Sequence, residues 1–169
     1  HPHHLAIIGG DPDGAAHSPV TEMARIKALS EELGIGDVVI FLGKRDQESL
    51  PEYYSAAEAL IMPSHYESFG MVALEAMACG TPVVASQIGG LAFLVQDGVT
   101  GFVVPYGEPD LLAARLTQLI LDPALRQQMG INAAQYALNY RWEKITDQIV
   151  EVYNRLLAPV AAGANTGTR

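Results

Sequence analysis

The sequence is poor in cysteine, in positive charge and in long apolar runs. Its single cysteine, Cys79, cannot form an internal disulfide and lies in an apolar stretch, so we interpret it as a buried small hydrophobe in a reducing compartment. Ten Lys and Arg residues stand against 19 Asp and Glu, a formal net charge of -9. This balance offers no basic surface and argues against nucleic acid or an anionic membrane as a partner.

No apolar run approaches the roughly 20 residues that span a bilayer, and the N-terminus has neither a basic region nor a hydrophobic signal core. We therefore expect no integral membrane segment and a cytoplasmic location. The opening "HPHHL" contains three histidines, which we interpret as a processing remnant or as solvated residues. We assign no metal.

Five short apolar runs have the length of buried strands: "LAIIGG", "VVIFLG", "ALIMPS", "PVVAS" and "GFVVP". Helical patterns lie between them, and the first has Ser18 and Pro19 as start signals and Gly34 as a stop signal. The alternation predicts one α/β domain with a Rossmann-like parallel sheet and helices on both faces. Ligands of such sheets bind beyond the carboxyl ends of the strands.

After Pro105 only helices are predicted, over about 110–121, 124–138 and 143–157. The last spaces Ile145, Ile149, Tyr153 and Leu156 three or four residues apart, so we expect it to lie against a surface along its length. The folded domain is predicted to cover residues 1–158. We expect the small, polar tail 159–169 to be disordered.

The stretch "HYESFGMVALEAMACGTPVVAS" carries two glutamates, Glu67 and Glu75, around a helix that we place over 69–78 with Ser68 as its N-cap. This helix is apolar nearly all round. A carboxylate in it costs several kcal/mol unless it is paired or faces a polar cleft. Two interpretations of Glu75 stay open, an ion pair with an internal Lys or Arg and contact with a ligand.

The start of this helix is a candidate anion site, because Gly70 leaves its amides accessible to a ligand. Eight helical residues rise about 12 Å, so the two carboxylates could contact different parts of one extended ligand. A nucleotide sugar has hydroxyl groups at both ends and phosphates between them. Glu75 would accept from ribose hydroxyls and Glu67 from sugar hydroxyls.

The run "ESFGMVALEAMACGTPVVAS" resembles the E-x7-E signature of retaining GT-B glycosyltransferases of family 4 (group 1). The likeness extends through "YYSAAEALIMPSHYE", "DGVTGFVVP" and "RWEKI" and covers nearly all of residues 5–157. The wording is most similar to sucrose-phosphate-synthase-like enzymes, and the family also builds exopolysaccharides.

The resemblance implies the C-terminal donor-binding domain, one half of a GT-B fold. Glu67 would be the catalytic residue at the transferred sugar, and Glu75 would hold the ribose. The remaining donor-binding positions that it implies are the backbone of Gly43, Lys44 and Arg45 at the base, and the amides of Phe69, Gly70, Met71 and Val72 at the sugar and phosphate. No metal or cofactor is implied, and the substrate would be a UDP-sugar such as UDP-glucose.

Four further residues could line the cleft. His65 and Tyr66 follow a predicted strand, and both a cleft position and an ordinary loop position stay open for them. Gly89 and Gly90 are consistent with a tight turn or with the close approach of a ligand. "GGDPDG" does not match the spacing G-x-G-x-x-G, which argues against an oxidoreductase.

The chain also departs from the family pattern. Compared with the family, we expect this stretch to lie after the first strand and helix of the donor domain and to be without the N-terminal acceptor domain. The open place in the sheet would be filled by another chain or segment. At Phe93 many members have a glutamate, and we interpret this phenylalanine as a core or cleft-wall residue.

The sequence therefore predicts the donor domain of a retaining, metal-independent hexosyltransferase. The alternatives are a nucleotide-sugar binding module that is inactive on its own and a GT-B nucleotide-sugar epimerase.

Overall fold

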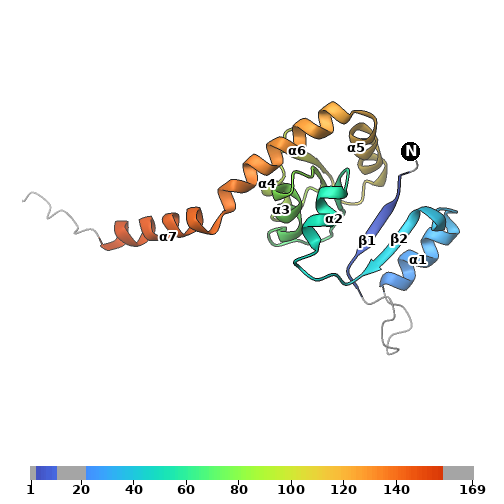
Figure 1. The fold of residues 1–169 in the computed structure, drawn as a ribbon, viewed down its shortest axis with the longest axis horizontal. Coiled ribbons are helices and arrows are strands. Elements are labelled where there is room, and N and C mark those ends of the chain that lie inside the picture. The colour runs from blue at the N-terminus through green and yellow to red at the C-terminus, as the bar shows by residue number, and fades with distance from the viewer. Residues whose placement is uncertain (1–2, 11–21, 158–169) are drawn as a thin grey trace, which may run out of the picture. The chain divides into compact units, whose positions relative to one another are not determined.

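The computed structural model of the chain describes residues 3–10 and 22–157 (Figure 1). The chain divides into two compact units, His1–Tyr53 and Tyr54–Arg169, which are described separately below. Ser18 and Pro19, the predicted helix start, lie outside the described residues, as does the tail 159–169. The expectation of one domain over residues 1–158 stays a prediction.

The first unit contains β1 (Leu5–Ile8), α1 (Glu22–Glu32), the 3-10 turn η1 (Gly36–Val38) and β2 (Val39–Gly43). Strands β1 and β2 pair in parallel, with Leu5 opposite Val39 and a register shift before Ile8. The chain leaves α1 through Gly34, whose φ of +68° confirms it as the stop signal. Helix α2 (Leu50–Ala56) begins in this unit and ends in the second.

The second unit contains β3 (Leu60–Met62), α3 (Met71–Ala78), β4 (Val83–Ser86), α4 (Leu91–Leu94) and β5 (Gly101–Val104). Its strands form a parallel sheet in the order β3-β4-β5. All four residues of β4 are buried, so both faces of this central strand are covered. All five predicted strands are confirmed, and so is the α/β class with helices on both sides, although the strands form two sheets rather than one.

The helices predicted after the last strand are α5 (Pro109–Leu121), α6 (Pro123–Ala137) and α7 (Trp142–Leu157), with the 3-10 turn η2 (Leu138–Tyr140) between the last two. A buried cluster of Val84, Phe102, Leu119 and Met129 joins β4 and β5 to α5 and α6. The side chain of Asp122 caps α6 by accepting a hydrogen bond from the amide of Leu125 at 2.9 Å. The cluster packs α5 and α6 against the sheet of the second unit.

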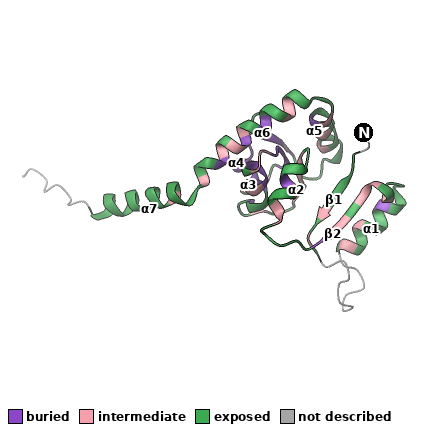
Figure 2. Ribbon diagram, viewed as in Figure 1, coloured by how far each residue is buried: buried purple, intermediate pink, exposed green. Residues whose placement is uncertain are grey.

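Helix α7 differs from its prediction. Apart from the half-buried Ile145, every residue of this helix is exposed (Figure 2). Its apolar residues include Trp142 and Leu156, which are 80% and 76% exposed. The spacing of its apolar residues predicts that one face of α7 packs against an apolar surface. None of the described residues covers that face of the helix. None of the described helices combines the length and the apolar character that a membrane crossing requires.

Candidate functional site

Helix α3 begins two residues later than predicted. Its first residue is Met71, and its N-cap is Gly70 with φ +98° in the left-handed region rather than Ser68. A glycine is favoured here for two reasons. The conformation strains other residues, and a Cβ at this position would lie 2.7 Å from Cδ2 of Leu91. The predicted start was wrong because it assumed that a side chain, that of Ser68, caps the helix. The backbone turn at Gly70 sets the first residue of α3 instead.

The carboxylate of Glu67 lies at the start of this helix. Its Oε1 accepts hydrogen bonds from the amide of Gly70 at 3.1 Å and from the amide of Phe69 at 3.4 Å. Met71 and Val72, both exposed, form the first helical turn. Amides in that turn have no partner within the helix. Four amides were predicted to bind the donor. Those of Phe69 and Gly70 donate instead to a carboxylate of the chain itself, and those of Met71 and Val72 lie in the first turn of α3.

Gly89 and Gly90 pack against the backbone beside Glu67. The amide of Gly90 donates to the carbonyl of Glu67 at 3.0 Å. A Cβ at Gly89 would lie 1.9 Å from that carbonyl oxygen, and a Cβ at Gly90 would lie 2.3 Å from Cα of Phe69. The close approach that requires glycine is thus made by the protein's own chain. This contact holds the loop that carries Glu67.

Glu75 is half-buried in α3, and its partner is Tyr54. The phenol of Tyr54 donates a hydrogen bond to Oε2 of Glu75 at 3.0 Å. Burial, and then the bond to this carboxylate, raise the pKa of the Tyr54 phenol. Within the described part of the chain, no lysine or arginine forms an ion pair with Glu75. The ion pair, one of the two interpretations of Glu75, is therefore not found among residues 3–10 and 22–157.

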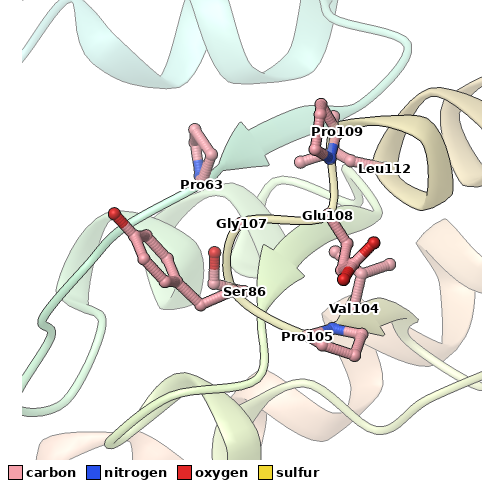
Figure 3. Close-up of a pocket in the computed structure, with 9 residues that line it drawn as sticks. Pro63, Ser86, Val104, Pro105, Gly107, Glu108, Pro109 and Leu112 are labelled. Atoms are coloured by element: carbon pink, nitrogen blue, oxygen red, sulfur yellow. The ribbon is translucent and has the colours of Figure 1, made fainter.

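A pocket of about 240 Å³ lies at the carboxyl ends of strands in the second unit (Figure 3). His65 packs edge-on against Tyr106, with ring centroids 4.9 Å apart, and Tyr66 is 81% exposed. The pocket is lined by Pro63, Ser86, Val104, Pro105, Tyr106, Gly107, Glu108, Pro109 and Leu112. None of these was predicted as a site residue. The signal that could have found Ser86 and Tyr106 is their place at the ends of "PVVAS" and "GFVVP".

Gly43, Lys44 and Arg45 belong to the first unit, at and just after the end of β2. Gly43 is buried with φ +66°, and Lys44 is exposed. The guanidinium of Arg45 donates through Nε to the hydroxyl of Tyr53 at 2.9 Å and lies over its ring. The role of this backbone in reading a base stays a prediction.

Phe93 is 83% exposed, so of its two interpretations the core position is wrong, and the cleft-wall position stays a prediction. It lies in the four-residue helix α4, in which Leu91 and Leu94 are the residues that turn inward. Spacing on that short helix leaves Phe93 on the outer side. In the described ranges 3–10 and 22–157, no group of three or more His, Cys, Asp or Glu side chains could hold a metal ion.

Parallel strands covered on both sides, followed by helices, define the chain as Rossmann-like, the fold of the C-terminal half of GT-B glycosyltransferases. The chain belongs to the family described as glycosyl transferases group 1, whose family model matches residues 1–136.

Among its relatives is the D-inositol 3-phosphate glycosyltransferase of Acidothermus cellulolyticus, which is 44% identical over 154 residues, 91% of this chain and 33% of that protein. Sucrose-phosphate synthase from Thermosynechococcus elongatus has a TM-score of 0.80 and 41% identity over 92% of this chain and 39% of its own. HepE of Anabaena, solved in complex with UDP-glucose, has a TM-score of 0.74 and 30% identity over 90% and 41%. The chain spans about a third of the length of the curated relatives that it matches.

Proposed function

We propose that the chain is the donor-binding part of a retaining, metal-independent, cytoplasmic glycosyltransferase of family 4. Its donor is UDP-glucose or a similar activated hexose. Membership of the group 1 family supports this proposal, and so does the likeness to HepE, a structure solved with UDP-glucose. Because the chain spans about a third of its relatives, we assign the acceptor to an N-terminal domain in the remainder of the protein.

The observation that carries the proposal is the pair of carboxylates on either side of one helix start. Glu67 Oε1 is bonded to the amides of Phe69 and Gly70, and Glu75 lies further along α3. A carboxylate can accept about four hydrogen bonds, so Glu67 keeps capacity for a sugar hydroxyl while it holds both amides. Glu75 accepts from the ribose.

The diphosphate is assigned to the first turn of α3. A diphosphate bound there would be faced by the amides of Met71 and Val72 and by the positive end of the helix dipole. In a retaining transfer, the bond between the sugar and the diphosphate breaks, and the leaving diphosphate takes the electron pair. Helix amides aimed at that charge stabilise the transition state without a metal. The acceptor oxygen then bonds to the sugar on the face that the diphosphate left, and its proton passes to an oxygen of the departing diphosphate.

The other predicted residues complete the assignment. The backbone of Gly43, Lys44 and Arg45 reads the base edge. His65 and Tyr66 line the cleft near the sugar, and Gly89 and Gly90 hold the loop of Glu67 through the bond from Gly90.

The test is calorimetric titration of the chain with UDP, ADP and GDP, each with and without its glucose or mannose conjugate. Glu75→Ala should weaken binding of the selected nucleotide by about 1–3 kcal/mol, because a hydrogen bond from the ribose loses its acceptor. The circular dichroism spectrum should be unchanged. Glu143→Ala, a change at an exposed glutamate of α7, is the matched control and should bind as the parent chain does.

A Glu75→Ala chain with unchanged affinity and reduced stability would make this glutamate a structural residue and would overturn the assignment. The share of the relatives that the chain spans favours a second candidate for the isolated chain, a binding module without transfer activity. Transferase assay of the longer protein separates the two. An epimerised sugar among its products, in place of a glycoside, would instead identify an epimerase.

A further inference from the structure

Tyr54 is a buried tyrosine that is hydrogen-bonded both to α3 and to the segment that follows this helix. It is 7% exposed, and its phenol donates to Oε2 of Glu75 at 3.0 Å. Its carbonyl accepts a hydrogen bond from Oγ1 of Thr81 at 2.5 Å. The amide of Thr81 in turn donates to the carbonyl of Ala76, the residue after Glu75. The backbone and the ring of Tyr54 are therefore both fixed relative to the helix that carries Glu75.

This arrangement restricts one oxygen of Glu75 and leaves the other available. Oε2 accepts from Tyr54, whereas Oε1 accepts no hydrogen bond from any residue that the structure describes. A glutamate side chain loses considerable rotamer freedom when a ligand fixes it. A phenol that already fixes the carboxylate lowers that cost, so the ligand meets a preorganised acceptor.

The hydrogen bond from Tyr54 to Glu75 is also charge-assisted. Its acceptor is a carboxylate, and hydrogen bonds with one charged partner are stronger than neutral ones. Burial of Tyr54 strengthens the bond further, because the effective dielectric constant is lower away from water. The same burial keeps the phenol protonated, since it raises the pKa of Tyr54.

We propose that Tyr54 is a positioning residue, which orients Glu75 so that its free oxygen accepts from the ribose of a bound nucleotide. The inference rests on the proposed function, because it requires Glu75 to contact the ribose. It adds a residue that lies outside the E-x7-E pair and that the sequence did not indicate.

The experiment is a titration of the chain and of its Tyr54→Phe variant with UDP and with 2′,3′-dideoxy-UDP, or with the ADP or GDP pair if that base is selected. The parent chain should prefer the ribonucleotide. Tyr54→Phe should lower the affinity for the ribonucleotide about 3- to 10-fold and leave the affinity for the dideoxy ligand unchanged. The ratio of the two affinities then falls, which a general loss of stability would not produce.

Tyr136→Phe is the matched control, because it removes a tyrosine hydroxyl that bonds elsewhere, to Tyr140 on η2. Its affinity ratio should equal that of the parent chain. If Tyr54→Phe is partly unfolded, the titration is repeated in sucrose, which favours the compact state without replacing the hydroxyl.

The outcomes distinguish a failure of the inference about Tyr54 from a failure of the proposed function on which it rests. A parent chain that binds none of the three nucleotides overturns both. A parent chain that prefers the ribonucleotide, together with a Tyr54→Phe variant of equal preference, overturns the positioning role alone. A fall in the ratio for Tyr54→Phe and not for Tyr136→Phe supports it.

Discussion

At the scale of the residue, the two glutamates differ in what holds them. Glu67 accepts from backbone amides of its own loop, whereas Glu75 accepts from a side chain on another helix. The first arrangement uses backbone amides, which every residue except proline supplies, in a loop that requires glycine at Gly70, Gly89 and Gly90. The second depends on one hydroxyl, so the orientation of Glu75 can be changed by a single atom.

Two tyrosines should make the free energy of unfolding depend on pH in the alkaline range. A bond with the hydroxyl of Tyr136, and then burial, raise the pKa of Tyr140 to about 12. Burial and the bond to Glu75 raise the pKa of Tyr54. An unfolded tyrosine ionises near a pKa of about 10. Both contributions are therefore complete below about pH 10 and decline at higher pH, because the unfolded state releases its protons first. The contribution of Tyr140 is lost by about pH 12.

We expect the free energy of unfolding in urea to fall between about pH 10 and pH 12, and to fall less steeply in Tyr140→Phe. The difference between the parent chain and the variant is the quantity that tests the prediction, because all other groups are common to the two proteins. Parallel pH profiles for the two proteins would contradict it.

The sequence located the candidate carboxylates but not their partners. Residue types at a set spacing identified Glu67 and Glu75. Tyr54 is 21 positions from Glu75, and only the fold brings the two together. For Phe93 the sequence indicated the wrong burial. Large aromatic residues are buried on average, but Phe93 is exposed because of its place on a four-residue helix.

At the scale of the element, helices α3 and α6 approach each other closely at a pair of glycines. A Cβ at Gly130 in α6 would lie 2.2 Å from the carbonyl oxygen of Gly80, just beyond α3. The absence of side chains here lets the backbone of one helix contact the end of the other. The end of the helix that carries Glu75 is thereby held against α6.

Gly130→Ala should destabilise the chain although alanine favours the helix by about 1 kcal/mol over glycine. The added Cβ forces the helix away from a backbone oxygen that cannot rotate aside, and overpacking of this kind costs about 1–3 kcal/mol. Urea unfolding measures the change. Gln127→Ala, at an exposed position of the same helix, should stay within about 0.5 kcal/mol. A Gly130→Ala chain as stable as the parent would refute the close contact.

Element identity followed from the sequence better than element ends did. Each short apolar run became a strand, since a strand covered on both faces is apolar along its length. The start of α3 was misplaced because several capping signals competed within "ESFG", and the left-handed turn at Gly70 prevailed.

At the scale of the whole molecule, the two units differ in how much they bury. Among the described residues of the first unit only Ser30 and Gly43 are buried, whereas the second unit contains the buried cluster around Val84 and Phe102. An isolated two-stranded sheet is marginally stable in water. The composition of the sequence indicated how many apolar residues are available for a core, but not that the second unit buries most of them.

We therefore expect faster hydrogen exchange in β1 and β2 than in the sheet of the second unit. The amide of Val84 in β4 should be protected at least about tenfold more than the amide of Phe41 in β2, because local opening costs less where little is buried. Exchange followed by nuclear magnetic resonance measures both amides in one sample. Equal protection would mean that the two units open together.

The exposed start of α7 gives the molecule a built-in optical reporter. Trp142 is the only tryptophan of the sequence, and it is 80% exposed. Its ring is already surrounded by water in the folded chain, so melting of the core leaves the emission nearly unchanged. Anything that settles on this helix shields the indole, shifts its emission to the blue and protects it from soluble quenchers. Fluorescence of the unlabelled chain is thus insensitive to unfolding and sensitive to association.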